Sequence, residues 1–209
     1  LSRSRRFSWD YETPADVRGR GPIRVELWST RDGGVTWQRT ATDDDGRSPI
    51  DVQLSAAGLY GFRLEVVAGQ ADAEGGPRSG ESPDTWVGID EEPPQVELLG
   101  VDRDEAVQPP TLVIRYAAKD SMLGQRSVRL LYSPNPDGPW ATITDELEAR
   151  GDYRWQPGRS VPARVYLRAE ATDAAGNVGF AATPDALSVA TTRFVGRLGG
   201  LRAEPPPAP

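Results

Sequence analysis

The chain has 209 residues, a net charge of −7, and neither histidine nor cysteine. Without these residues it has no disulfide, no thiolate metal site and no histidine general base. No apolar run approaches the ~20 residues that a membrane-spanning helix needs. Residues 1–92 carry 11 Arg against 17 acidic residues, and this balance disfavours binding to nucleic acid.

Residues 23–28 alternate apolar and polar side chains, as a half-buried β-strand does. The inward set of this strand is Ile23, Val25 and Leu27. Its outer face then carries three side chains that suit recognition: Arg24, Glu26 and Trp28. Trp37 follows the next turn and is expected beside Trp28 across a hairpin.

These four residues, Arg24, Glu26, Trp28 and Trp37, are the predicted binding residues. Exposed tryptophan beside arginine suits sugar stacking or a protein interface. The alternative is that the second domain, or a loop such as residues 41–50, covers them. The other tryptophans in apolar phase are expected in the core: Trp9, Trp86 and Trp155.

Residues 30–37 read Thr-Arg-Asp-Gly-Gly-Val-Thr-Trp and resemble the Asp-box of sialidase-type propellers. In that motif the aspartate accepts turn amides, glycine tolerates positive φ and tryptophan packs on the hairpin. The resemblance implies a turn stabiliser, and a ligand site is the alternative interpretation. Residues 137–140, Asp-Gly-Pro-Trp, are a reduced version of the same turn.

The next acidic loop offers a metal-binding hypothesis. Asp43, Asp44 and Asp45 precede Gly46, and hard cations such as calcium bind several carboxylate oxygens. The loop lacks the spacing of an EF-hand, so a solvated acidic loop is the alternative reading. No other cofactor is expected, although the acidic linker at residues 90–92 also suits calcium at a junction.

The chain repeats itself with an offset of about 100 residues. Residues 62–66, Phe-Arg-Leu-Glu-Val, recur at 167–171 as Leu-Arg-Ala-Glu-Ala. Three other matches keep the same order, pairing residues 7–11 with 112–116, 25–28 with 128–131 and 83–86 with 184–187. Such a period is the size of one β-sandwich domain. Prolines and glycines also punctuate the chain too often for long helices.

We therefore predict an all-β protein of two antiparallel β-sandwich domains, residues 1–92 and 93–198, with a Pro-rich tail at 199–209. The linker around Pro93 and Pro94 is expected to be stiff. Residues 95–101 form an extra first strand that the first domain lacks, so its own first strand is missing or lies upstream. The long segment 70–82 is expected to be functional or mobile.

Residues 173–177, Asp-Ala-Ala-Gly-Asn, resemble the late hairpin of bacterial Ig-like and fibronectin-III-like repeats. Leu54, Gly58 and Tyr60 resemble the tyrosine corner of that fold family, in which the hydroxyl binds a nearby carbonyl. The second domain departs from this pattern, with Ser160 six residues before Tyr166. The resemblance implies tandem Ig-like or fibronectin-III-like domains of a large secreted or envelope protein.

The expected function is a non-catalytic structural or protein-interaction module of a larger bacterial extracytoplasmic protein. The bias of 23 Arg to one Lys is typical of a GC-rich bacterial genome. Expected partners are other domains of the same polypeptide, envelope proteins or further copies, with neither nucleic acid nor membrane insertion. The first alternative is a carbohydrate-binding module that uses its exposed tryptophans, and the second is a carboxylate-pair hydrolase.

Overall fold

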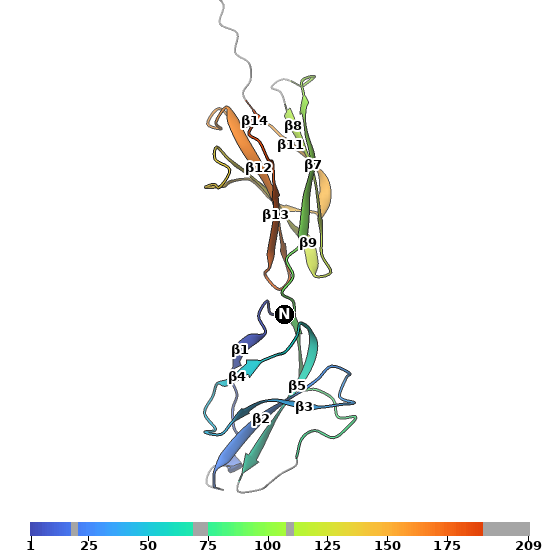
Figure 1. Cartoon of the computed structure of the whole chain (residues 1–209), viewed down its shortest axis with the longest axis vertical. Helices are drawn as coiled ribbons and strands as arrows, with labels where there is room; N and C mark the ends of the chain where they lie inside the picture. Colours follow the sequence, from blue (N-terminus) through green and yellow to red (C-terminus); the bar gives the residue numbers. More distant parts are fainter. Residues whose placement is uncertain (18–20, 69–74, 108–110, 190–209) are drawn as a thin grey trace, which may run out of the picture.

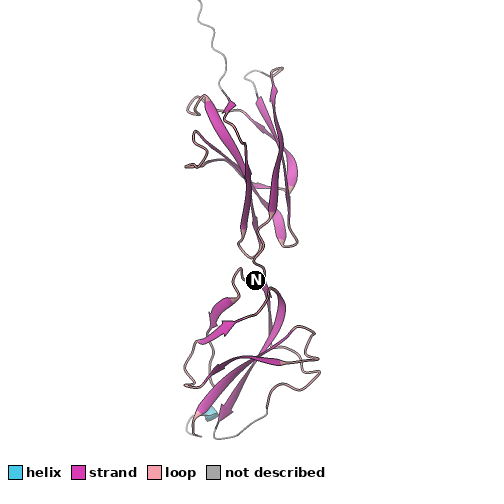
Figure 2. Ribbon diagram, in the orientation of Figure 1, coloured by secondary structure: helices cyan, strands magenta, loops and turns pink. Residues whose placement is uncertain are grey.

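The computed structural model describes residues 1–17, 21–68, 75–107 and 111–189. Within these residues the protein is all-β, as predicted, with several antiparallel sheets and one short 3₁₀ segment, η1 (Ala15–Val17) (Figure 2). No helix in the described ranges is long and apolar enough to cross a membrane. The predicted tail at 199–209 and residues 70–74 of the long segment 70–82 lie outside the described residues.

The N-terminal half, defined here as residues 1–89, contains two antiparallel sheets. Its strands are β1 (Arg6–Trp9), β2 (Ile23–Thr30), β3 (Gln38–Asp43), β4 (Ile50–Gln53), β5 (Gly58–Ala68) and β6 (Thr85–Ile89). One sheet pairs β1 with β4, and the other has the order β3-β2-β5-β6. Buried side chains from both sheets form one core, which includes Leu27, Ile50, Val52, Tyr60, Phe62 and Ile89.

The C-terminal half, residues 95–189, has the same two-sheet plan with more strands. They are β7 (Gln95–Asp104), β8 (Thr111–Lys119), β9 (Leu123–Ser133), β10 (Ala141–Leu147), β11 (Arg150–Trp155), β12 (Arg164–Asp173), β13 (Val178–Ala182) and β14 (Leu187–Ser188). One sheet has the order β11-β8-β7, and the other has the order β10-β9-β12-β13 with β14 also on β12. The core between them includes Leu112, Ile114, Val128, Leu130, Trp155, Val165 and Leu167.

Among the described strands, none before Asp90 pairs with one after it, and the two cores share no residue. Figure 1 shows the halves end to end, with the chain crossing between them after β6. At the crossing, Asn177 Nδ2 donates to the Asp90 carbonyl at 2.9 Å. A Cβ on Gly179 would lie 1.8 Å from the Pro94 carbonyl oxygen, so only glycine fits against this linker. The linker is therefore packed against the C-terminal half.

The first residues of the chain lie beside the end of β6. Ser2 forms an isolated parallel bridge with Ile89. The Ser2 amide donates to the Gly88 carbonyl, and the Asp90 amide donates to the Ser2 carbonyl, both at 2.9 Å. The chain therefore enters and leaves the N-terminal half at the same place (Figure 1).

The repeat predicted from sequence is visible in the strand pairing. β1 pairs with β4 as β8 pairs with β11, and β2 lies between β3 and β5 as β9 lies between β10 and β12. Both segments that begin Pro-Asp lead into strands, β6 and β14, that pair with the first residues of β5 and β12. The extra strand predicted at 95–101 is present as β7. Its place in the N-terminal half is empty among the described residues.

Candidate functional site

The predicted binding residues gather on one face of the β2 sheet, around a buried carboxylate. Glu26 is only 1% exposed, although strand phase predicts an outward side chain. Its Oε1 lies 2.9 Å from Arg24 Nε and 3.0 Å from Arg39 Nη1, and its Oε2 accepts a hydrogen bond from Trp28 Nε1 at 3.2 Å. The phase prediction was right, but the prediction of an exposed Glu26 was wrong because these three side chains cover it.

Trp28 and Trp37 line one hollow of about 630 Å³. Its other walls are Val35, Arg39, Gly75, Gly76, Pro77 and Ser79. A Cβ on Gly76 would lie 2.7 Å from the Trp28 ring, so the 75–79 segment rests directly on the indole. The Trp37 Nε1 is buried without a hydrogen-bond partner. Trp28 is therefore partly covered by the 75–79 segment.

The Asp32 turn fixes the position of Trp37. Asp32 Oδ1 accepts hydrogen bonds from Thr30 Oγ1 and the Thr36 amide, and Oδ2 accepts one from Thr36 Oγ1 at 2.6 Å. These bonds from Thr36 and Thr30 lower the pKa of Asp32 to about 2. Gly34 has φ +95, and a Cβ there would lie 2.0 Å from the Glu81 carbonyl oxygen. The geometry is that of a self-bonded turn, in line with the Asp-box resemblance.

In the C-terminal half an arginine fills the corresponding place. The guanidinium of Arg168 lies 3.8 Å from the Phe180 ring centroid and 5.4 Å from that of Trp140, the counterpart of Trp37. Arg63 is the counterpart of Arg168 in the repeat, and its Nη1 lies 3.7 Å from Glu81 instead. Arg168 and Arg63 therefore make different contacts in the two halves.

The acidic loop at 43–45 uses its carboxylates for local bonds. Asp43 Oδ1 accepts the amides of Asp45 and Gly46, its Oδ2 accepts the Tyr11 hydroxyl, and Asp45 Oδ1 accepts the Arg47 amide. Burial opposes ionisation of Asp43, but these donors hold its pKa below the usual value, and burial together with Asp43 raises the pKa of Tyr11. Within the described ranges Asp43, Asp44 and Asp45 do not form a three-carboxylate cluster.

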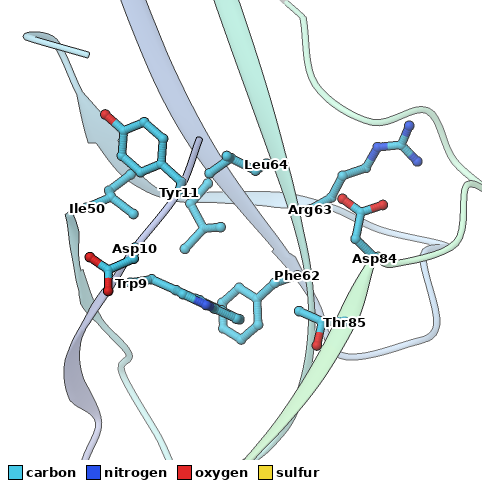
Figure 3. A pocket seen from close by; sticks show the side chains of 10 residues that line it. Trp9, Asp10, Tyr11, Ile50, Phe62, Arg63, Leu64, Asp84 and Thr85 are labelled. Carbon is cyan, nitrogen blue, oxygen red and sulfur yellow. The ribbon is translucent and has the colours of Figure 1, made fainter. Parts of the chain in front are cut away.

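A second hollow opens at the aromatic end of β1. It has a volume of about 110 Å³ and lies between residues 9–11 and the facing strands β5 and β6. Figure 3 shows Trp9 beside Phe62 in its centre, with Asp10 and Tyr11 on one side and Arg63 and Asp84 on the other. The Trp9 and Phe62 rings meet edge to face at 5.3 Å. Sequence reasoning placed Trp9 in the core and did not foresee this opening.

Several solved structures are similar to this chain. A protein of the DUF3823 family from Bacteroides ovatus matches 90% of this chain and all of its own, at 10% identity and a TM-score of 0.31. At this TM-score the likeness carries no argument about the fold or the function of this chain. No protein-family model and no curated protein matches the chain.

Proposed function

We propose that the protein is a non-catalytic structural and protein-interaction module of a larger bacterial extracytoplasmic protein. In this proposal each half is an Ig-like or fibronectin-III-like sandwich. Two facing antiparallel sheets in each half support that reading. So does the Tyr60 hydroxyl, which donates to the Ala56 carbonyl at 2.9 Å as a tyrosine corner requires.

The observation that carries the interaction role is the open edge of β1. In the C-terminal half β7 pairs along β8 and also lies against β12 and β13. In the N-terminal half β1, the counterpart of β8, pairs only with β4 among the described strands. An unpaired edge beside an aromatic hollow is the kind of surface that accepts an added strand.

The register of β1 identifies the backbone groups that are free. Leu54 donates its amide to the Arg5 carbonyl at 2.9 Å, and Ser8 faces Asp51 three residues further along β1. Because bonded pairs alternate in an antiparallel ladder, the backbone groups of Ser8 point away from β4. The proposed occupant is an extended segment of a partner protein with alternating apolar residues, like β7.

A peptide with the β7 sequence, residues 95–104, serves as the probe for this edge. Labelled peptide titrated onto the full chain should bind in a fluorescence anisotropy assay. Ser8→Pro should abolish binding, because proline removes the outward amide while leaving the β1–β4 ladder intact. Ser8→Ala is the matched control, since both variants lose the Ser8 Oγ bond to Asp51 but only the proline loses the amide.

Equal binding to the wild type, Ser8→Pro and Ser8→Ala proteins would contradict strand addition at this edge. Melting curves of Ser8→Pro and Ser8→Ala check that both variants are folded. A peptide that binds no variant at all would remove the main support for the interaction role.

Carbohydrate binding is the second candidate, and the Trp28–Trp37 hollow is the observation that favours it. Tryptophan faces pack against sugar rings, and Trp28 and Trp37 line the same hollow. Trp37→Ala should abolish any signal of the full chain on a glycan array. Trp86→Ala is the matched control, because Trp86 is 46% exposed and does not line the hollow. Loss of signal in both variants, or in neither, would reject the site.

A further inference from the structure

Three aspartates from separate segments meet where the two halves join. Asp90 lies in the linker after β6, Asp120 in the β8–β9 turn and Asp173 at the end of β12. Each offers a carboxylate oxygen, and these oxygens all lie within 4.8 Å of one another. It is the one such acidic group in the part of the chain that the structure describes.

Local hydrogen bonds hold two of the carboxylates in place from the C-terminal half. Asp173 Oδ1 accepts the amides of Ala175 and Asn177 at 2.8 and 2.9 Å, and its Oδ2 accepts Asn177 Nδ2 at 2.8 Å. Asp120 Oδ1 accepts the Met122 amide at 2.6 Å. These hydrogen bonds fix the Asp173 carboxylate in place although Asp173 is only 6% exposed.

The third carboxylate leaves an atom unsatisfied. Asp90 Oδ1 accepts the Glu92 amide at 3.1 Å, but Asp90 Oδ2 is buried and has no hydrogen-bond partner. Ionised carboxylates only accept hydrogen bonds, so neighbouring Asp120 and Asp173 supply no donor. A buried acceptor of this kind needs a proton or a cation.

Basic side chains do not supply that cation in the described structure. Among the described residues no ion pair involves Asp90, Asp120 or Asp173. Arg3 reaches the same turn, but its Nη1 donates to the Gly176 carbonyl at 3.3 Å. Three carboxylates within 4.8 Å therefore repel one another without a counter-charge.

We propose that Asp90, Asp120 and Asp173 bind a calcium ion that fastens the linker to the C-terminal half. Calcium takes six to eight oxygen ligands in a flexible geometry, so water and carbonyl oxygens complete the set. Because Asp90 belongs to the linker and the other two to the C-terminal half, the bound ion fixes the direction in which the N-terminal half departs. The site uses no residue of the β1 edge or of the tryptophan hollow.

Isothermal titration of the full chain with calcium chloride, after treatment with EDTA, tests the site. We expect one ion per chain with a Kd of ~10⁻⁴–10⁻³ M, as in extracellular modules. Saturating calcium should raise the melting temperature, and EDTA should reverse the rise. Asp120→Asn should weaken binding at least ~10-fold, because the amide keeps the Met122 bond but loses the charge.

The matched control is Asp44→Asn, which removes one exposed carboxylate from the 43–45 loop. It should bind calcium like the wild type. Binding lost in Asp44→Asn and kept in Asp120→Asn would transfer the ion to that loop and overturn the proposal. No heat and no melting shift at millimolar calcium would also overturn it, and a melting temperature that rises only on acidification would show that a shared proton replaces the ion.

Discussion

The two halves of the molecule share a framework and differ in what they leave unfilled. The C-terminal half has β7 on the edge of its first sheet and Arg168 between Trp140 and Phe180. The N-terminal half has an open β1 edge and a hollow beside Trp37 at the corresponding places. The strands that build the core are duplicated, but the groups that close the surface are not. Recognition in this protein is therefore expected in the N-terminal half.

Charge shows the same divergence at one cross-strand pair. In the C-terminal half Arg129 faces Glu170, an attractive pair that Arg168 extends. In the N-terminal half Glu26 faces Glu65, two carboxylates directly opposite each other. Arg24 and Arg39 both pair with Glu26 and offset its negative charge. The N-terminal half therefore balances this position with arginines that do not face Glu26 across the β2–β5 pair. The predictions that follow test whether equivalent residues of the two halves contribute independently to stability.

The largest expected effect comes from removing a core aromatic. Phe62→Ala should destabilise the N-terminal half by about 3–5 kcal/mol, because Phe62 is 1% exposed and leaves a cavity. Differential scanning calorimetry should show the transition of this half moving down while the other stays. Leu167→Ala, its repeat counterpart, should do the reverse. A single transition that moves as a whole in both variants would mean that the halves unfold as one unit.

Removing the buried carboxylates should affect the halves unequally. Glu170→Gln should cost about 2–3 kcal/mol, because it leaves Arg129 and Arg168 without their partner. Glu26→Gln should cost only about 1 kcal/mol, since it also ends the repulsion with Glu65. Urea denaturation of both variants measures the difference. A greater loss in Glu26→Gln would show that the arginine network outweighs that repulsion.

The tyrosine corner belongs to one half only. The position of Tyr60 in the repeat is taken by Val165, which is fully buried and has no hydroxyl. Tyr60→Phe should therefore cost about 1 kcal/mol through the lost bond to the Ala56 carbonyl. Tyr166→Phe is the matched control in the other half, and its midpoint in urea should stay at the wild-type value. Equal losses in the two variants would contradict this assignment of the corner.

The smallest effect is a pH dependence at Glu65. Burial, with Glu81 and Glu26 adding repulsion against the attraction of Arg63, raises the pKa of Glu65 above 4.5. The folded state then holds this proton more tightly than the unfolded state, so the contribution to stability is present below the unfolded pKa and lost as pH rises through the folded one. Glu65→Gln should stabilise the chain by about 0.5 kcal/mol at pH 7 and by nothing below about pH 4.

Melting curves between pH 4 and pH 7 measure this difference. Glu97→Gln on the exposed face of β7 is the control and should not change the pH profile. If Glu65→Gln is still more stable than the wild type at pH 4, the gain in stability comes from packing and not from the protonation of Glu65.

Much of the fold was predictable because a period of two decides which face of a strand is buried. Val25 and Leu27 are buried, and the repeat located β2, β5, β9 and β12. Phase alone was insufficient where a distant segment covers a strand. Arg39 reaches Glu26 from the neighbouring strand, and residues 75–79 lie on Trp28 from far along the chain, which no local pattern reveals. Trp86 was expected in the core but is 46% exposed on β6, so that prediction was wrong.

Side chains that meet from distant segments were the hardest to predict from the sequence. Asp90 and its acidic neighbours suggested calcium at the junction, but Asp120 and Asp173 stand 30 and more residues away. Only the packing of the linker against the β8–β9 and β12–β13 turns brings the three together. The consecutive aspartates at 43–45 looked more convincing in sequence, yet adjacent side chains in a tight turn diverge and bind their own backbone.

The pairing of Ser2 with the strand end at Ile89 has a mechanical consequence. Tension applied between Leu1 and Ser188 would first load the two hydrogen bonds that join Ser2 to Gly88 and Asp90. The rest of the N-terminal half, from β1 to β5, lies outside this path and would not carry the force. As long as these two hydrogen bonds hold, the force passes through them into the C-terminal half, and the half with the open edge and the hollow carries no load.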